Sequence, residues 1–526
     1  MCSEVEVAIA GAGPTGLALA CGLLANGVSV RVLDKAPGPA ATSRALGLQP
    51  RGAEVLDHLG ALGDLADRSV RIGRIAIHVG GSRVGTLEVG RPTPLVTRPG
   101  LLVSQAEVEA ALRSRLRDLG GSVEWGREVA DVTQDREGVV VATAARGGTN
   151  AAQEKFRASW VVGCDGAHSQ VRKLAGIGFP GVALIERFLL ADVQADLPIP
   201  RDEVAVWLRT DQMLGVFPLP GADLWRLMAP AEPLPAAATG EEVVPALLAS
   251  WSGHTGLAAP AVKNVVWTST FRVHRRLADR YRQGRIMLAG DAAHIHSPLG
   301  GQGMNTGLGD AENLAWKLAL VARGRADVTL LDTYENERRP VASEVLDSTS
   351  AMTRVVLGDS APARLIRDGV FVPVLKRPFV QRLIWEQASQ LRIGYRRGVL
   401  ARGERRRGFA APRRRPRAGD RVPDLSCRRA DGTPTRLHAE LGGRWVLLGS
   451  PTVTGSAADS AASRLGADLV TVLEPLEPLD SSAGDILLVR PDGHLACRAD
   501  RADKDPASAA ERVGAWIGHA LEGGRR

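Results

Sequence analysis

The spacing of hydrophobic and polar positions predicts two kinds of region in this chain. Residues 5–9 alternate as in a strand, residues 17–24 repeat with helical spacing, and residues 28–32 alternate again. This order predicts a parallel βαβ unit near the N-terminus. Between residues 182 and 275, short strand-like stretches are separated by Pro and Gly, which is typical of a mostly antiparallel sheet.

The turn between the first strand and the first helix carries Gly11, Gly13 and Gly16 in the spacing GxGxxG. In a βαβ unit this spacing predicts a dinucleotide-binding site. Gly11 allows the tight turn, Gly13 lets a pyrophosphate approach, and Gly16 lets the helix pack on the sheet. Asp34, at the end of the second strand, can accept hydrogen bonds from a ribose. Its neighbour Lys35 is a further candidate for cofactor binding.

A second glycine-rich stretch follows a short apolar strand at residues 286–289. It runs from Gly290 to Gly307, reads GDAAHIHSPLGGQGMNTG, and leads into a helical apolar pattern. Glycine lets the backbone approach a flat ligand, and the free N–H groups at a helix start favour negative charge. His294 and His296 have no acidic neighbour in sequence, so we expect them to be structural rather than catalytic bases.

A third motif, Asp165-Gly166, follows strand-like residues 160–162. With GxGxxG first, this motif second and Gly290-Asp291 third, the chain resembles the group A single-component FAD-dependent aromatic hydroxylases, which share the fold of para-hydroxybenzoate hydroxylase. The resemblance covers about residues 5–345. The HSPLGGQGMNTG form of the loop and an additional C-terminal domain make the chain most similar to bacterial hydroxylases of aromatic polyketides.

The resemblance implies an FAD site and a role for each matching residue. Asp291 should bind the ribityl chain, and the loop at 300–305 should face the pyrimidine end of the isoalloxazine. A turn or helix cap is an alternative explanation of Asp165, and a surface ion pair of Arg44. The implied cofactor-binding residues are Gly11, Gly13, Gly16, Asp34, Lys35, Arg44, Gln105, Asp165, Gly290, Asp291, Gly301, Gly303, Met304 and Asn305. Arg51, a candidate for the substrate chamber, and Pro298 are the catalytic candidates.

Large aromatic side chains suited to a flat pocket are few in the predicted antiparallel sheet. The substrate-binding candidates are Trp207, Phe217 and Trp225. Ordinary core packing is the alternative for each, so we expect at most one or two of them to line the pocket. The chain has only three tyrosines, at 281, 334 and 395, and none falls in the sheet. We therefore expect no tyrosine relay that deprotonates the substrate.

We predict an α/β protein in which a Rossmann-type FAD-binding domain is interleaved with a mostly antiparallel substrate domain, followed by a thioredoxin-like α/β domain. The predicted boundaries are 1–71, 99–178 and 276–400 for the FAD-binding domain, 72–98 and 179–275 for the substrate domain, 401–417 for an Arg-rich linker and 418–526 for the third domain. Ser450-Pro-Thr-Val stands where a thioredoxin has its cysteine pair, so we expect a structural or assembly role there.

Composition narrows the function classes. A chain of 526 residues should form two or three domains. The net charge of +8 comes from Arg, but no nucleic-acid motif accompanies it, so we expect no nucleic-acid partner. Five scattered cysteines without CxxC or metal-ligand spacing indicate a reducing cytoplasm and no metal site. We see no signal peptide and no membrane-spanning run, and so expect no membrane contact. A homodimer is left open.

The resemblance also implies a reaction. NADPH, or NADH, would reduce FAD, and reduced FAD would react with O2 to a C4a-hydroperoxide that hydroxylates an electron-rich aromatic carbon. The missing tyrosine relay favours a polycyclic aromatic polyketide, whose hydroxyl groups are already acidic, over a small phenol. Three alternatives stay open: a Baeyer–Villiger oxygenase or epoxidase on the same scaffold, a hydroxylase of a simple phenol, and a non-catalytic flavoprotein.

Overall fold

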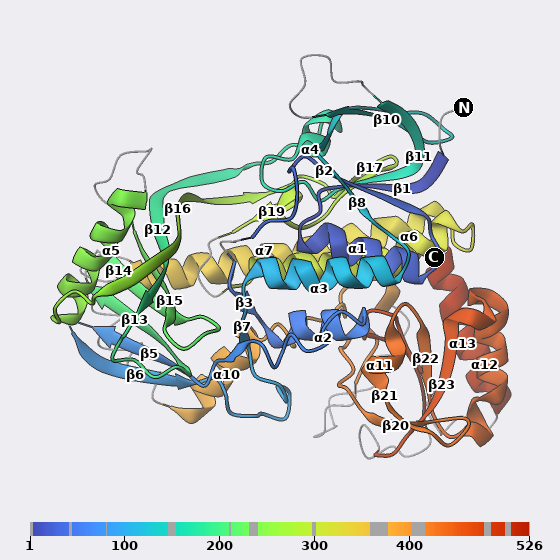
Figure 1. Ribbon diagram of the computed structural model, residues 1–526. Coiled ribbons are helices and arrows are strands. Elements are labelled where there is room, and N and C mark those ends of the chain that lie inside the picture. Colours follow the sequence, from blue (N-terminus) through green and yellow to red (C-terminus); the bar gives the residue numbers. More distant parts are fainter. Residues whose placement is uncertain are drawn as a thin grey trace.

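Three large sheets and the helices between them make up the protein (Figure 1). The computed structural model describes residues 4–41, 45–79, 81–145, 154–209, 212–230, 240–296, 301–357, 377–401, 416–477, 485–499 and 506–524. Residues 416–524, with the gaps just given, are called the C-terminal module below. They lie on one side of the central helices, and two long strands connect the other two sheets (Figure 1).

The first sheet has the strand order β17-β18-β11-β1-β2-β8, with β10 and β9 continuing from β11. Its strands are β1 Glu4–Ala10, β2 Val30–Asp34, β8 Val123–Trp125, β9 Arg127–Gln134, β10 Val139–Ala145, β11 Glu154–Gly163, β17 Arg282–Gln283 and β18 Ile286–Leu288. The pairs β1–β2, β1–β11, β2–β8 and β11–β18 are parallel. The carboxyl ends of β1, β2, β11 and β18 therefore point the same way, and the three sequence motifs follow these ends.

Helices pack on this sheet through one continuous hydrophobic core. Helix α1 contacts both α3 and α6, and α2 contacts α6. The helices of this part are α1 Pro14–Ala25, α2 Pro50–His58, α3 Gln105–Asp118, α4 Gln170–Leu174, α6 Gly303–Ala322 and α7 Asp332–Leu357. Short apolar side chains such as Ala18, Ala311 and Ala315 let these helices approach one another closely.

The second sheet has the order β19-β16-β12-β15-β14-β13-β5-β6 and is antiparallel except for the pair β13–β5. Its strands are β5 Arg74–Val79, β6 Ser82–Glu88, β12 Gly181–Ala195, β13 Glu203–Arg209, β14 Gln212–Pro218, β15 Leu224–Pro230, β16 Val262–Leu277 and β19 His294–Ile295. Helix α5, Gly240–Thr255, covers its outer side, and β5 and β6 come from the N-terminal part of the chain (Figure 1).

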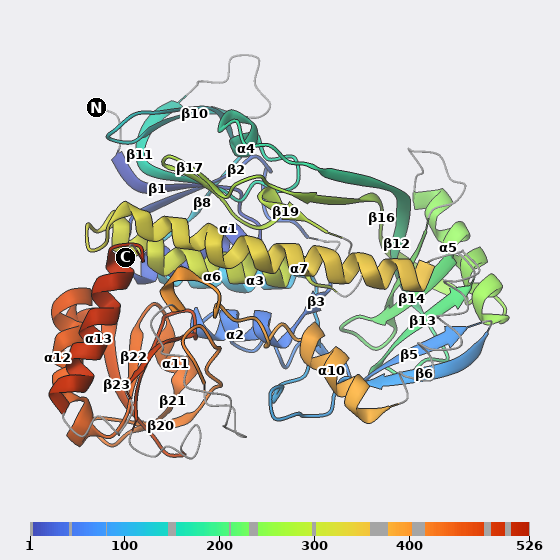
Figure 2. The ribbon, with the colours of Figure 1, turned by 180° about the vertical axis from the view of Figure 1, so that it is seen from behind.

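Two smaller elements connect these sheets. Strands β3 Gly47–Leu48, β4 Val70–Arg71 and β7 Leu101–Leu102 form a separate three-stranded sheet. Seen from behind, α7 runs from the first sheet toward the second, and α10, Pro378–Ala388, lies beside β6 (Figure 2). The FAD-type βαβ unit and the antiparallel sheet are therefore parts of one interleaved body.

The C-terminal module holds the third sheet, in the order β21-β20-β23-β22-β24-β25. Its elements are β20 Ser426–Arg429, β21 Pro434–Arg436, α11 Leu437–Leu441, β22 Trp445–Leu448, α12 Pro451–Leu465, β23 Val470–Pro475, β24 Ile486–Val489, β25 Leu495–Ala499 and α13 Pro506–Leu521. Helices α12 and α13 cover one face, and the same hydrophobic cluster includes Trp316 and Leu320 of α6. The predicted α/β fold class is confirmed, whereas the thioredoxin-like description stays a prediction.

Candidate functional site

The first glycine motif forms a tight turn with an open outer side. Gly11 has φ of +104°, and a Cβ there would lie 2.3 Å from the carbonyl oxygen of Cys164. A Cβ on Gly16 would lie 2.0 Å from the carbonyl oxygen of Gly11. A Cβ on Gly13 would meet no protein atom within 4 Å. Gly11 and Gly16 are therefore required by packing, whereas Gly13 leaves space beside the start of α1 that fits a pyrophosphate.

Asp34 ties this turn to the end of β2. Its Oδ2 accepts a hydrogen bond from Ala12 N at 2.7 Å, and its Oδ1 accepts one from Ala36 N at 2.7 Å. Each carboxylate oxygen can accept a further hydrogen bond. Asp34 is half-buried and Lys35 is exposed. This geometry fits an acid that also binds ribose hydroxyls.

The Gly290-Asp291 turn follows the carboxyl end of β18. Gly290 has φ of +61°, and a Cβ there would lie 2.5 Å from Thr15 Oγ1. Its N–H donates to Asp310 Oδ2 at 3.1 Å. The Asp291 carboxylate is exposed, yet the protein atoms crowded around it disfavour its charged form and raise its pKa. An accessible carboxylate in such a place fits hydroxyl donors, such as those of a ribityl chain.

The loop before α6 is fixed by the Asn305 side chain, which is 1 % exposed. Its Oδ1 accepts from Gln49 N at 2.9 Å, and its Nδ2 donates to the carbonyl oxygens of Gly47 and Gly301 at 3.0 and 2.7 Å. Gly301 has φ of +61° and lies directly beside Gly47. Because this amide group is already used, only the backbone of Asn305 remains for a ligand. Helix α6 begins at Gly303, so its first N–H groups are directed at this loop.

The second sheet presents different residues on its two faces, because side chains alternate along a strand. Trp207 and Trp225 lie on the face that packs against α5. Phe217 lies on the opposite face, called the inner face below, together with Met213 and Met228. The other members of the inner face are Phe188, Leu190, Asp192, Leu208, Arg226, Trp267 and Phe271.

Comparison with known proteins agrees with this geometry. Residues 4–349 match the family model of the FAD binding domain, and residues 415–520 match that of the aromatic-ring hydroxylase C-terminal domain. The chain belongs to the FAD-dependent aromatic-ring hydroxylases.

Relatives of this hydroxylase match over nearly its whole length. A flavin-dependent monooxygenase of Mycobacteroides abscessus is 36% identical over 504 residues, which is 93% of this chain and 96% of that protein. The 6-methylpretetramide 4-monooxygenase of Streptomyces rimosus is 35% identical, over 94% of this chain and 91% of that protein. The structure of an anhydrotetracycline hydroxylase from Streptomyces rimosus superposes with a TM-score of 0.76 at 31% identity, covering 97% and 99% of the two chains.

The remaining cofactor candidates of the hydroxylase are placed less directly. Arg44 and Pro298 lie outside the described residues, so their roles stay predictions. Gln105 begins α3, donates from Nε2 to Glu109 Oε1 at 2.8 Å, and its N–H donates to Ala45 O at 3.2 Å. Met304, in the first turn of α6, is partly buried against the hydrophobic core.

Asp165 caps helix α4, which is the alternative considered for it from sequence. Its Oδ2 accepts from Gln170 N at 2.7 Å and from Val171 N at 3.1 Å, and its Oδ1 accepts from the Ser169 hydroxyl. The preceding Cys164 packs against Gly11. The DG motif therefore supports the GxGxxG turn, and direct contact of Asp165 with FAD or NADPH stays a prediction.

Arg51 does not lie near the inner face. Its side chain is buried between α2, α6 and the C-terminal module, where Nη2 pairs with Glu312 and donates to Asp492 O at 2.9 Å. Nη1 lies 3.3 Å from Glu54 Oε2. These partners make Arg51 an interdomain contact, and its role in the substrate chamber stays a prediction. Asp492 lies 441 residues from Arg51 in the sequence, so the residues around Arg51 could not reveal this contact.

The two tryptophan candidates lie where the core-packing alternative places them, and their contact with substrate stays a prediction. Trp207 stacks on His78 with ring centroids 4.7 Å apart and packs on Trp251 of α5 at 5.9 Å. Trp225 is 2 % exposed on the same face. Both serve core packing, and only Phe217 lies on the inner face. Because side chains alternate along β14, Met213 lies on the same face as Phe217. The sequence alone did not show which of the two faces of β14 is the inner one.

A polar pair on the inner face was missed from sequence. Arg226 Nε and Nη2 donate to Asp192 Oδ1 and Oδ2 at 2.7 and 2.8 Å, and the two residues are 3% and 8% exposed. Strand register places Phe217, Arg226, Asp192 and Trp267 in one row across four strands. The Arg226 guanidinium lies 5.4 Å from the Trp267 ring centroid. The alternation of residues along β15 could have shown that Arg226 shares a face with Met228. That β15 pairs with β12, which carries Asp192, could not be predicted from the sequence.

His294 has no acidic neighbour in sequence, but the fold supplies one. Its Nε2 lies 2.7 Å from Asp310 Oδ2, and both side chains are fully buried. Asp310 also pairs with Arg338 Nε at 2.7 Å. The sequence did not reveal Asp310 as the partner, because Asp310 lies two turns into α6 and approaches His294 only in the folded protein. This burial agrees with a structural role for His294.

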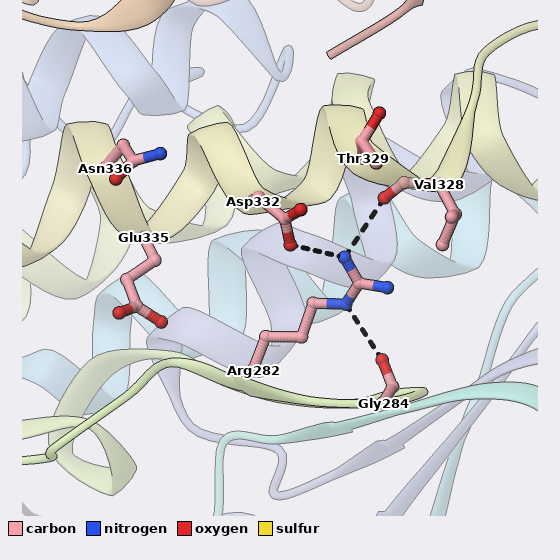
Figure 3. A pocket seen from close by; sticks show the side chains of 7 residues that line it. All are labelled: Arg282, Gly284, Val328, Thr329, Asp332, Glu335 and Asn336. Carbon is pink, nitrogen blue, oxygen red and sulfur yellow. Dashed lines mark hydrogen bonds and ion pairs between the residues drawn. The ribbon is translucent and has the colours of Figure 1, made fainter. Parts of the chain in front are cut away.

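A surface groove of about 510 Å³ lies elsewhere (Figure 3). Arg282 points across it to Asp332 at 2.7 Å and to Val328 O at 3.1 Å (Figure 3). Gly284 lies before β18, whereas Gly290 follows it. The groove is therefore at the amino end of the parallel strands, opposite the end where ligands of such sheets bind. Among the described residues, no acidic, His or Cys group has metal-site geometry, and no helix is long and apolar enough to cross a membrane.

Proposed function

We propose that this hydroxylase uses NADPH and O2 to hydroxylate a polycyclic aromatic polyketide that binds between the inner face and the flavin loop. The observation that carries the proposal is the composition of the inner face. It combines four aromatic side chains and two methionines with the Asp192–Arg226 ion pair. Wide apolar surface with few polar groups suits a flat ligand of several rings.

The inner face lies close to the flavin loop. Phe217 packs against the cluster that contains Leu46 and Leu102. Leu46 precedes Gly47, whose carbonyl oxygen is bonded to Asn305 at the start of α6. A substrate on this face would therefore reach the edge of the isoalloxazine. Asp192 and Arg226 would then meet its polar edge, the carboxylate accepting from a phenol hydroxyl and the guanidinium donating to a carbonyl.

No tyrosine is positioned to activate the substrate. The Tyr334 hydroxyl donates to Leu288 O at 2.9 Å, and Tyr395 contacts Arg338 at 3.1 Å. Burial raises the pKa of Tyr395 to about 12, and it raises the pKa of Tyr281 and Tyr334 as well. All three tyrosines of the chain lie outside the second sheet. A substrate with intrinsically acidic, delocalised hydroxyl groups needs no such relay.

The residues of the chain bind and orient rather than react. Gly13, Asp34 and Asp291 would hold FAD, which when bound accepts hydride from NADPH and activates O2. The N–H groups at the start of α6 favour negative charge on the flavin ring. The inner face would exclude water and present one aromatic carbon. The balance is one NADPH, one proton, one O2 and one substrate giving NADP⁺, water and the hydroxylated product. The cytoplasmic location and the homodimer stay predictions.

The test compares NADPH consumption and product formation for hydroxyanthraquinones and for 4-hydroxybenzoate. We expect coupled turnover with the polycyclic compounds, with a product heavier by one oxygen atom. Coupled turnover of simple phenols alone would overturn the polyketide assignment and leave the FAD hydroxylase intact. The product's carbon skeleton decides the alternative chemistry, because a Baeyer–Villiger reaction inserts oxygen into the ring and hydroxylation leaves the ring unchanged.

A further inference from the structure

One turn of the C-terminal module packs against the FAD-binding part of the protein. This turn, Arg490–His494, connects β24 and β25 and is called the key turn below. It meets one side of α6 and the start of α7. Arg490 is 1 % exposed and Asp492 is fully buried. Contacts between domains of one chain are ordinarily polar and partly hydrated, so complete burial of charge marks this contact as different.

Four charges are balanced where the key turn meets the two helices. Arg490 Nη1 and Nη2 each lie 2.8 Å from the Glu337 carboxylate, and Arg490 Nε lies 3.0 Å from Asp492 Oδ1. Lys317 Nζ lies 2.8 Å from Glu337 Oε2. Asn313 Nδ2 donates to Asp492 Oδ2 at 3.1 Å. Each charge has an opposite partner, so removing one member leaves another buried and unpaired.

A short chain of side chains leads from the key turn to the flavin site. The ring of Tyr395 lies 4.3 Å from that of His494, and its hydroxyl accepts from Arg338 Nη1 at 3.1 Å. Arg338 Nε donates to Asp310 Oδ1 at 2.7 Å. Asp310 in turn accepts the N–H of Gly290. Three side chains thus connect the key turn with the turn that carries Asp291.

Arg338 is also bonded to α6 near its start, because Nη2 donates to Thr306 O at 3.0 Å. Thr306 lies one turn beyond Gly303, where α6 begins. A displacement of Arg338 would therefore change both the Gly290-Asp291 turn and the helix start at the flavin loop. Tyr395 restrains Arg338 from the side of the C-terminal module.

We propose that the key turn, acting through Tyr395, Arg338 and Asp310, holds the Gly290-Asp291 turn in the position that binds FAD. This gives the C-terminal module a role in cofactor binding although Ser450-Pro-Thr-Val replaces a redox cysteine pair. Tyr395, Arg338 and Asp310 are positioning residues in this proposal. It rests on FAD binding and is independent of the polyketide assignment.

The test measures FAD affinity without any substrate. Tyr395→Phe removes one oxygen atom and keeps the ring, and we expect the FAD Kd of the apoprotein to rise roughly three- to tenfold. Asp492→Asn should raise it roughly tenfold, because Arg490 loses a charged partner. The visible absorption spectrum of bound flavin should change in both variants. Circular dichroism of each apoprotein, recorded well below its melting temperature, shows that it is folded.

Asp485→Asn is the matched control. Asp485 pairs with Arg498 inside the same module, and both side chains are 7% exposed, but the pair lies at the far end of β24 and β25 from the key turn. We expect its FAD Kd and flavin spectrum to match the parent protein. The proposal is overturned if folded Tyr395→Phe binds FAD like the parent, or if Asp485→Asn weakens FAD binding equally. Tyr395→Phe alone decides the matter if Asp492→Asn does not fold.

Discussion

The cofactor side and the proposed substrate side of this hydroxylase are built from different parts of the chain. On the cofactor side the backbone is decisive. A Cβ on Gly11 or Gly290 would collide with protein atoms, whereas a Cβ on Gly13 would occupy the open space beside α1. On the substrate side the side chains are decisive, because the two faces of one sheet carry Phe217 inward and Trp225 outward. A backbone site tolerates few substitutions, whereas a side-chain site can change its ligand while the fold is retained.

The largest expected effect separates two glycines of the same motif. Gly11→Ala places a Cβ 2.3 Å from Cys164 O at φ of +104°, so both apoprotein stability and FAD binding should be lost. Gly13→Ala meets no protein atom, so the apoprotein should melt like the parent while FAD affinity falls roughly a hundredfold. Thermal melting and FAD titration measure the two properties. Equal melting of both apoproteins would contradict the comparison.

A second pair of variants separates the two faces of the sheet. Trp225→Ala should destabilise the protein by about 3–5 kcal/mol, because it leaves a cavity under α5. Phe217→Ala should lower the stability by about 1 kcal/mol and raise the KM for a polycyclic substrate roughly tenfold. Urea unfolding and steady-state kinetics are the measurements. A KM that rises in folded Trp225→Ala and stays constant in Phe217→Ala would reverse the assignment of faces.

We expect Asp291 to make FAD binding dependent on pH. Asp291→Ala should raise the FAD Kd roughly tenfold through loss of a charge-assisted acceptor. Because the pKa of Asp291 is raised, its accepting, ionised form is lost on acidification at a higher pH than for an ordinary aspartate. FAD affinity of the parent should therefore fall as the pH is lowered toward that raised pKa. Asp291→Asn should remove this part of the pH dependence, which is measured by titrating the FAD Kd against pH. If the FAD Kd of Asp291→Asn still rises on acidification as in the parent, Asp291 is not the group responsible.

The smallest expected effect concerns the cysteines of the C-terminal module. Cys427 is fully buried, and burial raises the pKa of its thiol to about 11, so it is a poor nucleophile at neutral pH. Replacing Cys427 and Cys497 by Ser should leave turnover per bound FAD unchanged. Activity of the folded double variant is compared with the parent at equal flavin content. A large loss would show redox chemistry in the module.

The same comparison explains what the sequence could predict. Gly11, Gly13 and Gly290 were identifiable because their function is local and depends on backbone freedom within a few residues. The face of Trp207 was not, because it depends on the register of β13 with β5, a strand more than a hundred residues earlier. The partners of Arg51 and His294 could not be predicted for the same reason, since Asp492 and Asp310 reach them only through the tertiary fold.

Oxygen incorporation by FAD-loaded protein under ¹⁸O2, with a hydroxyanthraquinone and NADPH, tests the proposed monooxygenase reaction most directly. We expect a yellow protein that consumes one NADPH for each product molecule and places one ¹⁸O atom on an aromatic carbon. A colourless protein that cannot be reconstituted with FAD, or a product whose new oxygen comes from water, would show that the protein is not an FAD-dependent monooxygenase.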